Sequence, residues 1–530
     1  GYEGTPSKSI DITPTYSGPV WWLATDGSDE DGEGSSASPF ASLKHTLKKV
    51  AKGDTIMLKA GTYSGSENRN IELSESSSGG ALNIFDQLQS VVITSEKGAD
   101  STIIDAEYLG LHFAIIGSNT RTLDSTFQII GLTFTKGRNS FENASGNAGG
   151  GSFFIHADQY YNQNLNYDEA SKMQPKFKNC IFTDNEAISS GNGNKVKDGG
   201  AVLLNNASVI FENCTFEGNV AGSQGGAIGV RHSDQVSIDT LWIRNSSFIS
   251  NSVLAPNNSS IFAQGGAIGF TSGTNAIITN TIFEKNMVST DGSSANGGAI
   301  FISNTWSGQL NKHVWIVNSR ITKNIAKPSS GNSSVGSVQG GGIFAASPFV
   351  MVNTIVDSND ASMYQQGASG QGGGIFLNPN SGWDFNGNEV FSQHYLVNNT
   401  IVNNIAGGPN GGTGGGLHVQ PNNQNFEGTW FNNIIYGNSV GSNAPYPDGS
   451  NIDFFGDKNA WNNIRQDYNN IGRSANGPLY NDLTWGSNTY DLQPGFVGPS
   501  NYQLSDGSTM MGLGTTSYNG IDGPTFDYLN

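Results

Sequence analysis

Cysteine is almost absent from this chain, with two residues among 530. So few thiols exclude a disulfide framework, and they fit an exported protein as well as a cytosolic one. Charge is also scarce, because Asp, Glu, Lys and Arg together make up 13% of the residues, with 26 basic against 44 acidic. The net charge of −18 repels a nucleic-acid backbone and an anionic membrane, so we expect neither as a partner.

Long hydrophobic runs are missing as well. No segment approaches the roughly 18 apolar residues that a membrane span needs. The chain starts at Gly1 with neither the basic nor the hydrophobic stretch of an export signal. We therefore expect a mature chain without a membrane span, located outside the cell or on its surface.

Glycine, by contrast, is abundant, at 71 residues. The chain is too rich in hydrophobic (35%) and aromatic (10%) residues to be disordered. It is also too rich in Gly, Asn and Ser to be helical. This composition predicts an all-β protein with many tight turns.

A seven-residue phrase with Asn at both ends recurs eight times, as in "NCIFTDN" and "NTIFEKN". The phrases start 32 to 45 residues apart, at Asn179, Asn213, Asn245, Asn280, Asn318, Asn353, Asn398 and Asn432. A period near 35 with variable insertions indicates a solenoid, in which each repeat is one turn of a coil.

The columns of this phrase predict which side chains face inward. Its fourth residue is always bulky and apolar, and the second is small or polar, so on a strand both share the inner face and the third faces out. Cys180 and Cys214 both fall in the second column, one turn apart. Free buried thiols are favoured over a disulfide there, because parallel neighbours direct their Cβ bonds alike.

A second phrase, Gly-Gly-(Ala/Gly)-(Val/Ile/Leu), lies between successive Asn phrases, at Gly199, Gly225, Gly265, Gly297, Gly340, Gly372 and Gly414. The two phrases together require at least two short strands per turn. A Gly pair suits a corner with positive φ or close backbone approach. Asn tolerates the left-handed conformation, and its amide can bond the same amide one turn away. Stacked in register, such turns form a parallel β-helix of about ten turns.

These phrases resemble the FxxN and GGA(I/L/V) repeats of chlamydial polymorphic membrane proteins and of bacterial β-helix proteins of the pectate-lyase-like superfamily. The resemblance covers residues 149–438. It implies a right-handed parallel β-helix, in a superfamily that contains adhesins, structural surface proteins, lyases and glycosidases.

The flanks fit one structural domain in three parts: an entry and capping segment (1–65), the β-helix (66–475) and a C-terminal closing segment (476–530). Residues 21–65 resemble the entry segment of secreted β-helix proteins. There we expect a helix with Ser38 as N-cap and Pro39 at its first position, covering the open end of the coil with Leu43, Leu47 and Val50. Residues 494–514 resemble a closing segment.

The loop "DGSDEDGEG" (26–34) has five acidic residues in nine. Its oxygen-rich side chains make Asp26, Asp29 and Asp31 candidate Ca²⁺ ligands. An acidic turn that needs no metal is the other interpretation, and no cofactor is expected to be required.

Basic side chains in the repeats are scattered. Lys285 and Lys323 occupy the same column, and Arg320 lies close to them. One hypothesis makes these residues the base of a lyase acting on an acidic sugar. The other treats them as solvated charges on an exposed face.

Long insertions interrupt the repeat at residues 156–177, 378–396 and 441–470. They mix Tyr, Trp, Phe, Asn and Asp, which is typical of sugar-stacking or protein-contact surfaces and also of loops that only cover strands.

The sequence therefore predicts an exported surface or matrix protein with a structural and adhesive role. It would be a rigid, non-catalytic β-helical scaffold, with self-association or a cell-surface polysaccharide as its partner. The alternative is a polysaccharide lyase or glycoside hydrolase acting on acidic polysaccharide.

Overall fold

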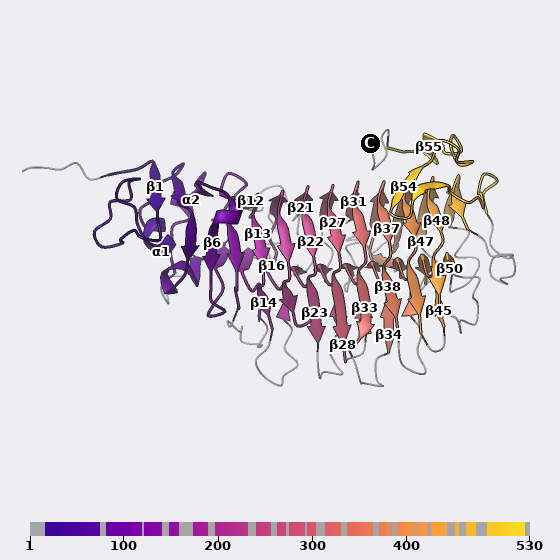
Figure 1. Cartoon of the computed structure of the whole chain (residues 1–530), viewed down its shortest axis with the longest axis horizontal. Helices are drawn as coiled ribbons and strands as arrows, with labels where there is room; N and C mark the ends of the chain where they lie inside the picture. The colour runs from indigo at the N-terminus through magenta and orange to yellow at the C-terminus, as the bar shows by residue number, and fades with distance from the viewer. Residues whose placement is uncertain are drawn as a thin grey trace, which may run out of the picture.

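The chain forms an elongated parallel β-helix (Figure 1). The computed structural model describes residues 16–74, 81–118, 121–139, 148–157, 173–188, 197–231, 240–255, 262–271, 275–291, 294–303, 313–329, 336–363, 370–379, 381–383, 389–408, 411–420, 426–441, 451–454, 463–472 and 485–524. Parallel strands stacked in register confirm the predicted fold class.

Three long sheets enclose the body of the coil. Sheet A has the order β1 (Val20–Leu23), β2 (Thr55–Leu58), β5 (Val92–Ser95), β8 (Gln128–Ile130), β12 (Lys176–Lys178), β17 (Val209–Glu212), β21 (Thr240–Arg244), β26 (Asn275–Thr279), β31 (Val314–Val317), β36 (Phe349–Val352), β42 (Glu389–Val397), β47 (Phe426–Phe431) and β51 (Ile464–Asp467), with β41 (Ser381–Trp383) antiparallel to β42.

Sheet B follows A along the chain within each turn, across a corner. It consists of β3 (Gly61–Tyr63), β6 (Thr102–Asp105), β9 (Thr133–Thr135), β13 (Ile181–Thr183), β18 (Thr215–Glu217), β22 (Ser247–Ile249), β27 (Ile282–Glu284), β32 (Arg320–Thr322), β37 (Ile355–Asp357), β43 (Thr400–Val402), β48 (Ile434–Tyr436) and β52 (Asn470–Ile471).

Sheet C completes the body. It consists of β4 (Ile71–Ser74), β7 (Phe113–Gly117), β11 (Phe153–Ala157), β16 (Val202–Asn205), β20 (Ile228–Arg231), β25 (Ile268–Phe270), β30 (Ile300–Ile302), β35 (Ile343–Ala345), β40 (Ile375–Leu377), β46 (Leu417–Val419) and β50 (Ile452–Phe454). The rungs before β12 lack the Asn phrase, so the coil extends further toward the N-terminus than the repeats indicate.

Between sheets B and C the turns from β13 onward make an excursion that the sequence did not reveal. Sheet D contains β14 (Glu186–Ala187), β19 (Val220–Ala221), β23 (Ser252–Ala255), β28 (Met287–Thr290), β33 (Ile325–Pro328), β38 (Asp360–Ser362), β44 (Ile405–Gly407) and β49 (Ser439–Val440). Sheet E contains β24 (Ala263–Gln264), β29 (Ser294–Asn296), β34 (Ser337–Gln339), β39 (Gly370–Gln371) and β45 (Gly412–Thr413), and β10 (Ala148–Gly149) pairs with β15 (Lys197–Asp198) nearby.

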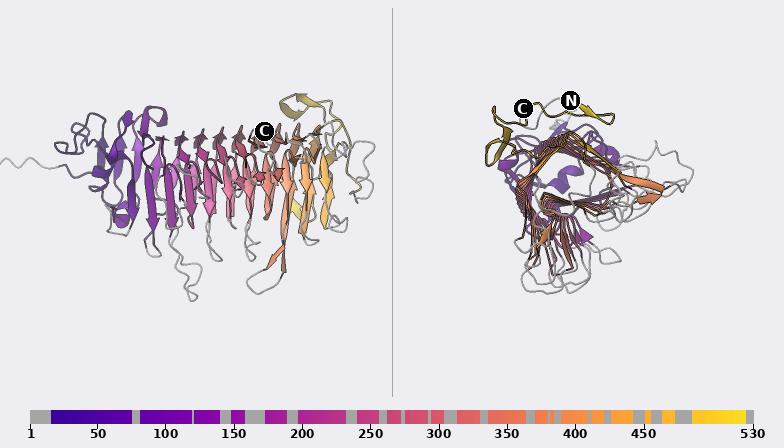
Figure 2. Two further views of the ribbon diagram at one scale, coloured as in Figure 1. Left: turned by 90° about the horizontal axis from the view of Figure 1, so that it is seen from below. Right: turned by 90° about the vertical axis from the view of Figure 1, so that its right-hand side faces the viewer.

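Sheets D and E form a side arm that projects from the body (Figure 2, right). Its narrow core consists almost wholly of Ala and Val, among them Ala221, Val253 and Val288. Small side chains let the two sheets pack closely, and they give a weaker sequence signal than the Phe and Ile of the body. The two strands per turn expected from the phrases are therefore a minimum.

The last Asn of each phrase lies buried at the neck of this arm. Asn219 is representative: its Nδ2 donates to the Phe182 carbonyl at 2.9 Å and to Asn251 Oδ1 at 2.8 Å. Asn251 Oδ1 also accepts from the Asn219 backbone N–H at 3.1 Å. The same bonds join Asn185, Asn219, Asn251, Asn286, Asn324, Asn359, Asn404, Asn438 and Asn451. We call this row the neck ladder.

The Gly-Gly phrase forms the other side of the neck. Gly225 has φ of +61°, in the left-handed region that favours glycine. A Cβ on Gly226 would lie 2.0 Å from the Gly266 carbonyl oxygen and 2.6 Å from the Ser252 nitrogen. The chain leaving sheet B and the chain returning to sheet C therefore pass too closely for any side chain.

The first Asn of each phrase makes the corner between sheets A and B. Its φ is between 49° and 57° in all eight phrases. Hydrogen bonds between side-chain amides link neighbouring turns: Asn213 Nδ2 donates to Asn179 Oδ1 at 3.1 Å, and Asn280 Nδ2 donates to Asn245 Oδ1 at 3.0 Å. Asn353 bonds Asn318 at 2.8 Å and Asn432 bonds Asn398 at 2.9 Å in the same way.

One hydrophobic core runs through the body from Trp21 to Ile471. Phe182, Phe216, Phe248 and Phe283 stack along it with ring centroids 4.7 to 4.9 Å apart. Cys180 and Cys214 are buried in this core as free thiols.

Two details of the N-terminal end differ from the prediction. Helix α1 spans Leu43–Leu47, so its N-cap is Ser42 rather than Ser38 and Pro39 precedes the helix instead of opening it. The reason is that Phe40 is still extended and bridges Leu23, while Asp29 accepts from the backbone N–H groups of Ala41 (2.9 Å) and Ser42 (3.1 Å). Leu43, Leu47 and Val50 are buried in the core, as expected. The described residues also form the short helices α2 (Phe85–Leu88), η1 (Ser66–Asn68) and η2 (Ala99–Ser101).

The C-terminal end closes differently from the expectation. Trp485 packs on the core and Tyr490 accepts a hydrogen bond from the Ile471 N–H at 2.9 Å, so residues 485–492 continue the last rung. The following residues then turn back along the outside of the coil, with hairpins β53 (Phe496–Gly498)–β54 (Asn501–Leu504) and β55 (Ser517–Tyr518)–β56 (Ile521–Asp522). We call residues 493–524 the C-terminal strap.

Buried His112 makes stability depend on pH. Its Nδ1 and Nε2 lie 2.9 Å from Ser152 Oγ and 3.0 Å from the Ile104 carbonyl oxygen. Burial lowers its pKa to about 4, although the bond to Ile104 favours the charged form. In the unfolded chain the pKa of this histidine is near 6.5. Between pH 6.5 and pH 4 the unfolded state therefore binds more protons than the folded state, and stability falls as the pH falls.

We expect His112 to remove about 2 kcal/mol from the free energy of unfolding between pH 7 and pH 5. Urea denaturation at both pH values measures this loss. The His112→Gln variant, which cannot take up the proton, should lose less stability than the wild type over the same interval. Equal losses in the two proteins would contradict the assignment.

Candidate functional site

The C-terminal strap crosses the corner between sheets A and B near the end of the coil (Figure 2). Over sheet B the strap places Tyr502, whose side chain is buried. At the corner the Thr515 N–H donates to Asn432 Oδ1, and over sheet A the ring centroid of Tyr518 lies 5.9 Å from that of Phe431. Two cavities lie beneath it, one on each side of the corner.

Tyr502 anchors the strap to a charged cluster on sheet B. Its hydroxyl donates to Asp357 Oδ2 at 3.2 Å and accepts from Asn403 Nδ2 at 3.2 Å. Arg320 donates two bonds to the Asp357 carboxylate, at 3.0 and 3.1 Å, and its guanidinium carbon lies 5.8 Å from the Tyr502 ring centroid. Burial and then the charge of Asp357 raise the pKa of Tyr502.

This arrangement separates the three basic residues singled out in the sequence. Arg320 is bound to Asp357 under the strap. The Nζ atoms of Lys285 and Lys323 lie 3.5 and 3.2 Å from Glu284 Oε1. Partial burial opposes the charge of Glu284, but Lys323 and Lys285 keep its pKa below the usual value. Neither lysine lines a cavity beneath the strap, and both side chains are more than half exposed.

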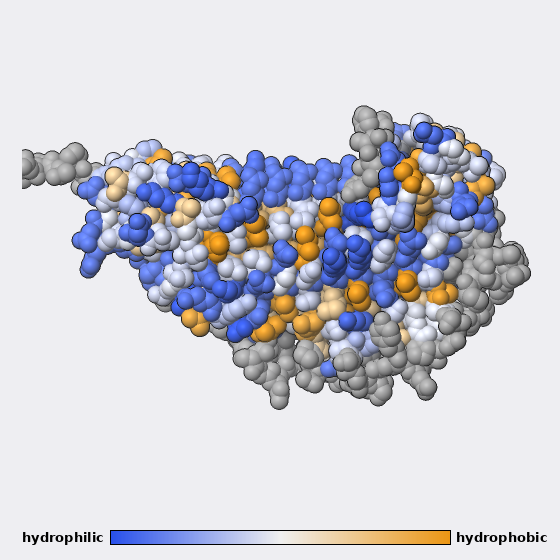
Figure 3. Space-filling model, viewed as in Figure 1, coloured by the Kyte–Doolittle hydropathy of each residue, from blue (hydrophilic) through white to orange (hydrophobic). Residues whose placement is uncertain are grey.

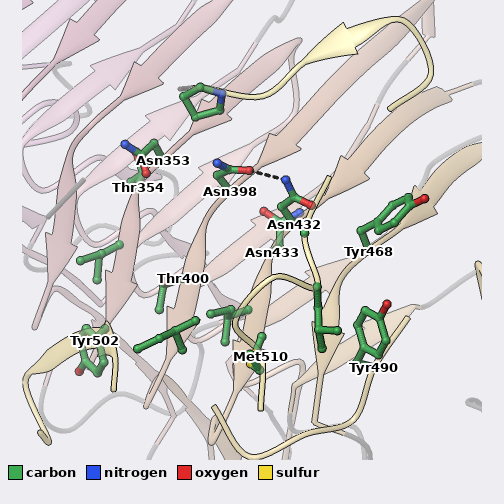
Figure 4. A pocket seen from close by; sticks show the side chains of 16 residues that line it. Asn353, Thr354, Asn398, Thr400, Asn432, Asn433, Tyr468, Tyr490, Tyr502 and Met510 are labelled. Atoms are coloured by element: carbon green, nitrogen blue, oxygen red, sulfur yellow. Dashed lines mark hydrogen bonds between the residues drawn. The ribbon is translucent and has the colours of Figure 1, made fainter. Parts of the chain in front are cut away.

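The cavity at the corner has a volume of about 300 Å³ (Figure 4). Tyr502 lies at one end and Tyr468 and Tyr490 at the other, with Asn398 and Asn432 between them. The Asn432 amide is already saturated: it donates to Asn398 Oδ1 (2.9 Å) and the Thr515 carbonyl (2.6 Å), and accepts from the Thr515 N–H (2.9 Å). This cavity therefore fits the packing of the strap better than the binding of a ligand.

The second cavity lies on the outer face of sheet A, with a volume of about 280 Å³. We call it the C-terminal groove. Strands β42, β47 and β51 and the strap surround it with Tyr395, Glu427, Gly428, Thr429, Asn463, Arg465, Asn519 and Ile521. Strand register places Tyr395, Thr429 and Arg465 in one outward column, and Gln393 and Glu427 in the next.

The polar groups of the C-terminal groove are partly connected. Tyr395 donates to Gln393 Oε1 at 2.9 Å, and Gln393 Nε2 donates to Glu427 Oε2 at 3.3 Å. Partial burial and then the Glu427 charge raise the pKa of Tyr395, so its hydroxyl keeps its proton at neutral pH. Arg465 Nη1 donates to Asn519 Oδ1 at 2.8 Å. In the described part of the chain no carboxylate forms an ion pair with Arg465, so its charge is available to a ligand.

The predicted insertions contain some residues of this groove, whereas Glu427 lies outside them. Tyr395 lies in the predicted insertion at 378–396, and Arg465 in that at 441–470. Outward positions do not recur from turn to turn, so only the length and aromatic content of the insertions gave a signal. In the first insertion, residues 158–172 lie outside the described residues.

The acidic loop at 26–34 is tied to the N-terminal cap. Asp29 accepts hydrogen bonds from the two backbone N–H groups just before α1, whereas Asp26 and Asp31 are exposed. Across the ranges that the structure describes, no three His, Cys, Asp or Glu side chains are grouped closely enough to hold a metal ion. Ca²⁺ binding by Asp26, Asp29 and Asp31 stays a prediction.

The described residues on the face shown in Figure 3 form no broad apolar patch. On the face shown in Figure 3, hydrophobic residues occur in small groups among hydrophilic ones. None of the helices in the described ranges is long and apolar enough to cross a membrane.

No family model and no curated protein matches the chain, so the resemblance to chlamydial polymorphic membrane proteins rests on the repeat phrases alone. Among solved structures, 17 chains match. Pectate lyase Pel9A is 13% identical, with 94% of this chain and 92% of that chain covered and a TM-score of 0.39. The PL6 family polysaccharide lyase Pedsa3628 from Pseudopedobacter saltans is 14% identical, with 83% and 94% covered and a TM-score of 0.40. Such distant similarity carries no argument about activity, which must come from the groove itself.

Removal of the Tyr502 ring should release the strap. The Tyr502→Ala variant leaves Ile355 and Val402 uncovered, and we expect it to lose about 3 kcal/mol of stability locally. Limited proteolysis should then cut within 493–524 faster than in the wild type while the coil stays resistant. The Tyr502→Phe variant, which keeps the ring, is the matched control. Equal cleavage of all three proteins would show that Tyr502 is not the anchor.

Proposed function

We propose that this protein is an exported polysaccharide-binding β-helix that engages a sugar chain in the C-terminal groove. The observation that carries the proposal is the grouping of Tyr395, Glu427 and Arg465 in one cavity on the outer face of a rigid sheet. A groove on an open sheet face admits a polymer, whereas an enclosed pocket admits only a small molecule.

The chemistry of the groove suits a sugar with a carboxylate. Among the described residues no carboxylate forms an ion pair with the Arg465 guanidinium, which can form a bidentate bond to a uronate. Glu427, Asn463 and Asn519 offer acceptors and donors for hydroxyl groups, and the Tyr395 ring offers an apolar face. The net charge of −18 opposes a dense polyanion at long range, so binding depends on these local contacts.

The rest of the molecule supports a scaffold role outside the cell. One core joins all the rungs, so the groove is held on a continuous rod. The two cysteines are buried in that core, away from oxidants. A structural and adhesive protein at a surface or in a matrix needs this combination of rigidity and a sugar-binding site. Self-association remains a prediction.

Loss of the guanidinium should weaken binding. We expect the Arg465→Ala variant to bind oligouronates about tenfold more weakly than the wild type, because a charged hydrogen bond is lost. Isothermal titration with a panel of uronate and neutral oligosaccharides measures the affinities. The Arg121→Ala variant, which removes an arginine near the N-terminal end, is the control. Failure of the wild type to bind any oligosaccharide would reject the proposal.

Eliminative cleavage is the second candidate function, favoured by the same three residues. Arg465 would bind the carboxylate of the sugar, and the Glu427 carboxylate would take the proton from the adjacent C5. Tyr395, which keeps its proton, would donate it to the glycosidic oxygen as the C4–O bond breaks and the C4–C5 double bond forms.

The unsaturated product of that reaction absorbs in the ultraviolet, so a spectroscopic assay on alginate, pectate and glycosaminoglycans tests it. We expect the Tyr395→Phe variant to lose more than about a hundredfold in kcat and to keep its affinity. The Lys323→Ala variant tests the sequence-based hypothesis in the same assay. If the wild type causes no change in absorbance with any of these polysaccharides, the cleavage hypothesis is rejected and the binding function remains.

A further inference from the structure

The C-terminal groove is the end of a longer feature on sheet A. Strand register places one outward residue of each rung in a single column, which reads Ile210, Trp242, Ile277, Trp315, Val350, Tyr395, Thr429 and Arg465. The last three line the C-terminal groove. A surface continuous with the groove therefore runs along the coil.

Aromatic rings occupy every second rung of this column. Trp242, Trp315 and Tyr395 alternate with the aliphatic Ile277 and Val350. Adjacent strands are about 4.8 Å apart, so the rings repeat every ~9.6 Å. We call these three residues the aromatic track. Trp315 is 43% exposed while Val350 is 3% exposed, so the aromatic side chain projects and the aliphatic one is covered.

The surroundings of the rings are polar. The Arg244 guanidinium lies over one face of the Trp242 ring, with its carbon 4.7 Å from the ring centroid, so a sugar that stacks on that face must displace it. The centroid of the His313 ring lies 6.3 Å from that of Trp315. Asn275 and Thr279 point outward on either side of Ile277, on the rung between the two tryptophans. Rings flanked by hydrogen-bonding groups match a sugar, which has an apolar face and hydroxyl groups around its edge.

We propose that the aromatic track binds an extended β-1,4-linked hexuronate chain and leads it into the C-terminal groove. This inference rests on the proposed function and adds the linkage of the sugar. In an extended β-1,4-linked chain, successive sugars are turned over, so the same face recurs at every second residue. That repeat is close in length to two rungs of the sheet, so one chain can stack on all three rings. A helical α-1,4-linked chain cannot keep its faces in this register.

Oligosaccharide length separates the track from the groove. From Trp242 to Tyr395 the track spans four rungs, or about 19 Å, and Arg465 lies two rungs further. A β-1,4-linked mannuronate disaccharide spans about two rungs, which is the separation of Tyr395 and Arg465, and can fill the groove alone, whereas a dodecasaccharide can cover both. Affinities for the two oligomers, measured by titration and by quenching of Trp fluorescence, therefore report on each part.

We expect Trp315→Ala to weaken binding of the dodecasaccharide about tenfold and that of the disaccharide less than about twofold. Trp315→Tyr should restore most of the affinity because it keeps a ring. Trp22→Ala is the matched control: Trp22 is a partly exposed tryptophan of sheet A outside the track. A helical oligogalacturonate of equal length should show no Trp315 dependence.

The outcomes distinguish the two proposals. If Arg465→Ala lowers the affinity for both oligomers but Trp315→Ala binds the dodecasaccharide like the wild type, the proposed role of the aromatic track is rejected and that of the C-terminal groove is supported. If the wild type binds neither oligomer, the groove is wrong as well. Thermal unfolding of each variant shows whether a loss of affinity reflects a loss of fold.

Discussion

The neck ladder is the interaction on which the rest of the structure depends. At the neck, the backbone that leaves sheet B for the side arm passes close to the backbone that returns to sheet C, and the polar groups buried there cannot reach water. One Asn per turn satisfies them. Its amide nitrogen donates to a carbonyl of the preceding turn and to the Asn amide of the next turn, and its oxygen accepts from a backbone N–H. An unsatisfied buried group costs about 1–3 kcal/mol, so no apolar residue can replace this side chain.

This constraint explains why the repeat was so visible in the sequence. Few residue types are tolerated at the neck and the corner. The neck requires an Asn amide, the left-handed backbone of the corner favours Asn or Gly, and a Cβ on the second Gly of a pair would meet backbone atoms of neighbouring strands. Their recurrence was enough to predict parallel strands and an inward fourth column. The arm was missed because its Ala and Val core is interchangeable with many small residues.

The candidate site could not be predicted to the same degree. Tyr395, Glu427 and Arg465 come from three different turns, and no phrase marks them. Only register brings them together, and register follows from where each insertion ends. The hypothesis built on Lys285, Arg320 and Lys323 used proximity in sequence. It could not foresee that a residue 182 positions further along, Tyr502, would cover Arg320 and its Asp357 partner. Long-range folding of the strap leaves no local pattern.

The strap also fixes the order in which this site can appear. Asn519 and Ile521, which wall the C-terminal groove, belong to the last described stretch of the chain, whereas the rungs beneath them precede it. A coil that grows rung by rung thus presents Tyr395, Glu427 and Arg465 before the strap supplies the remaining wall of the groove. On the function proposed above, the groove would therefore reach its full affinity only when the strap has folded onto a finished coil, so the last residues of the chain would act as a late switch for binding.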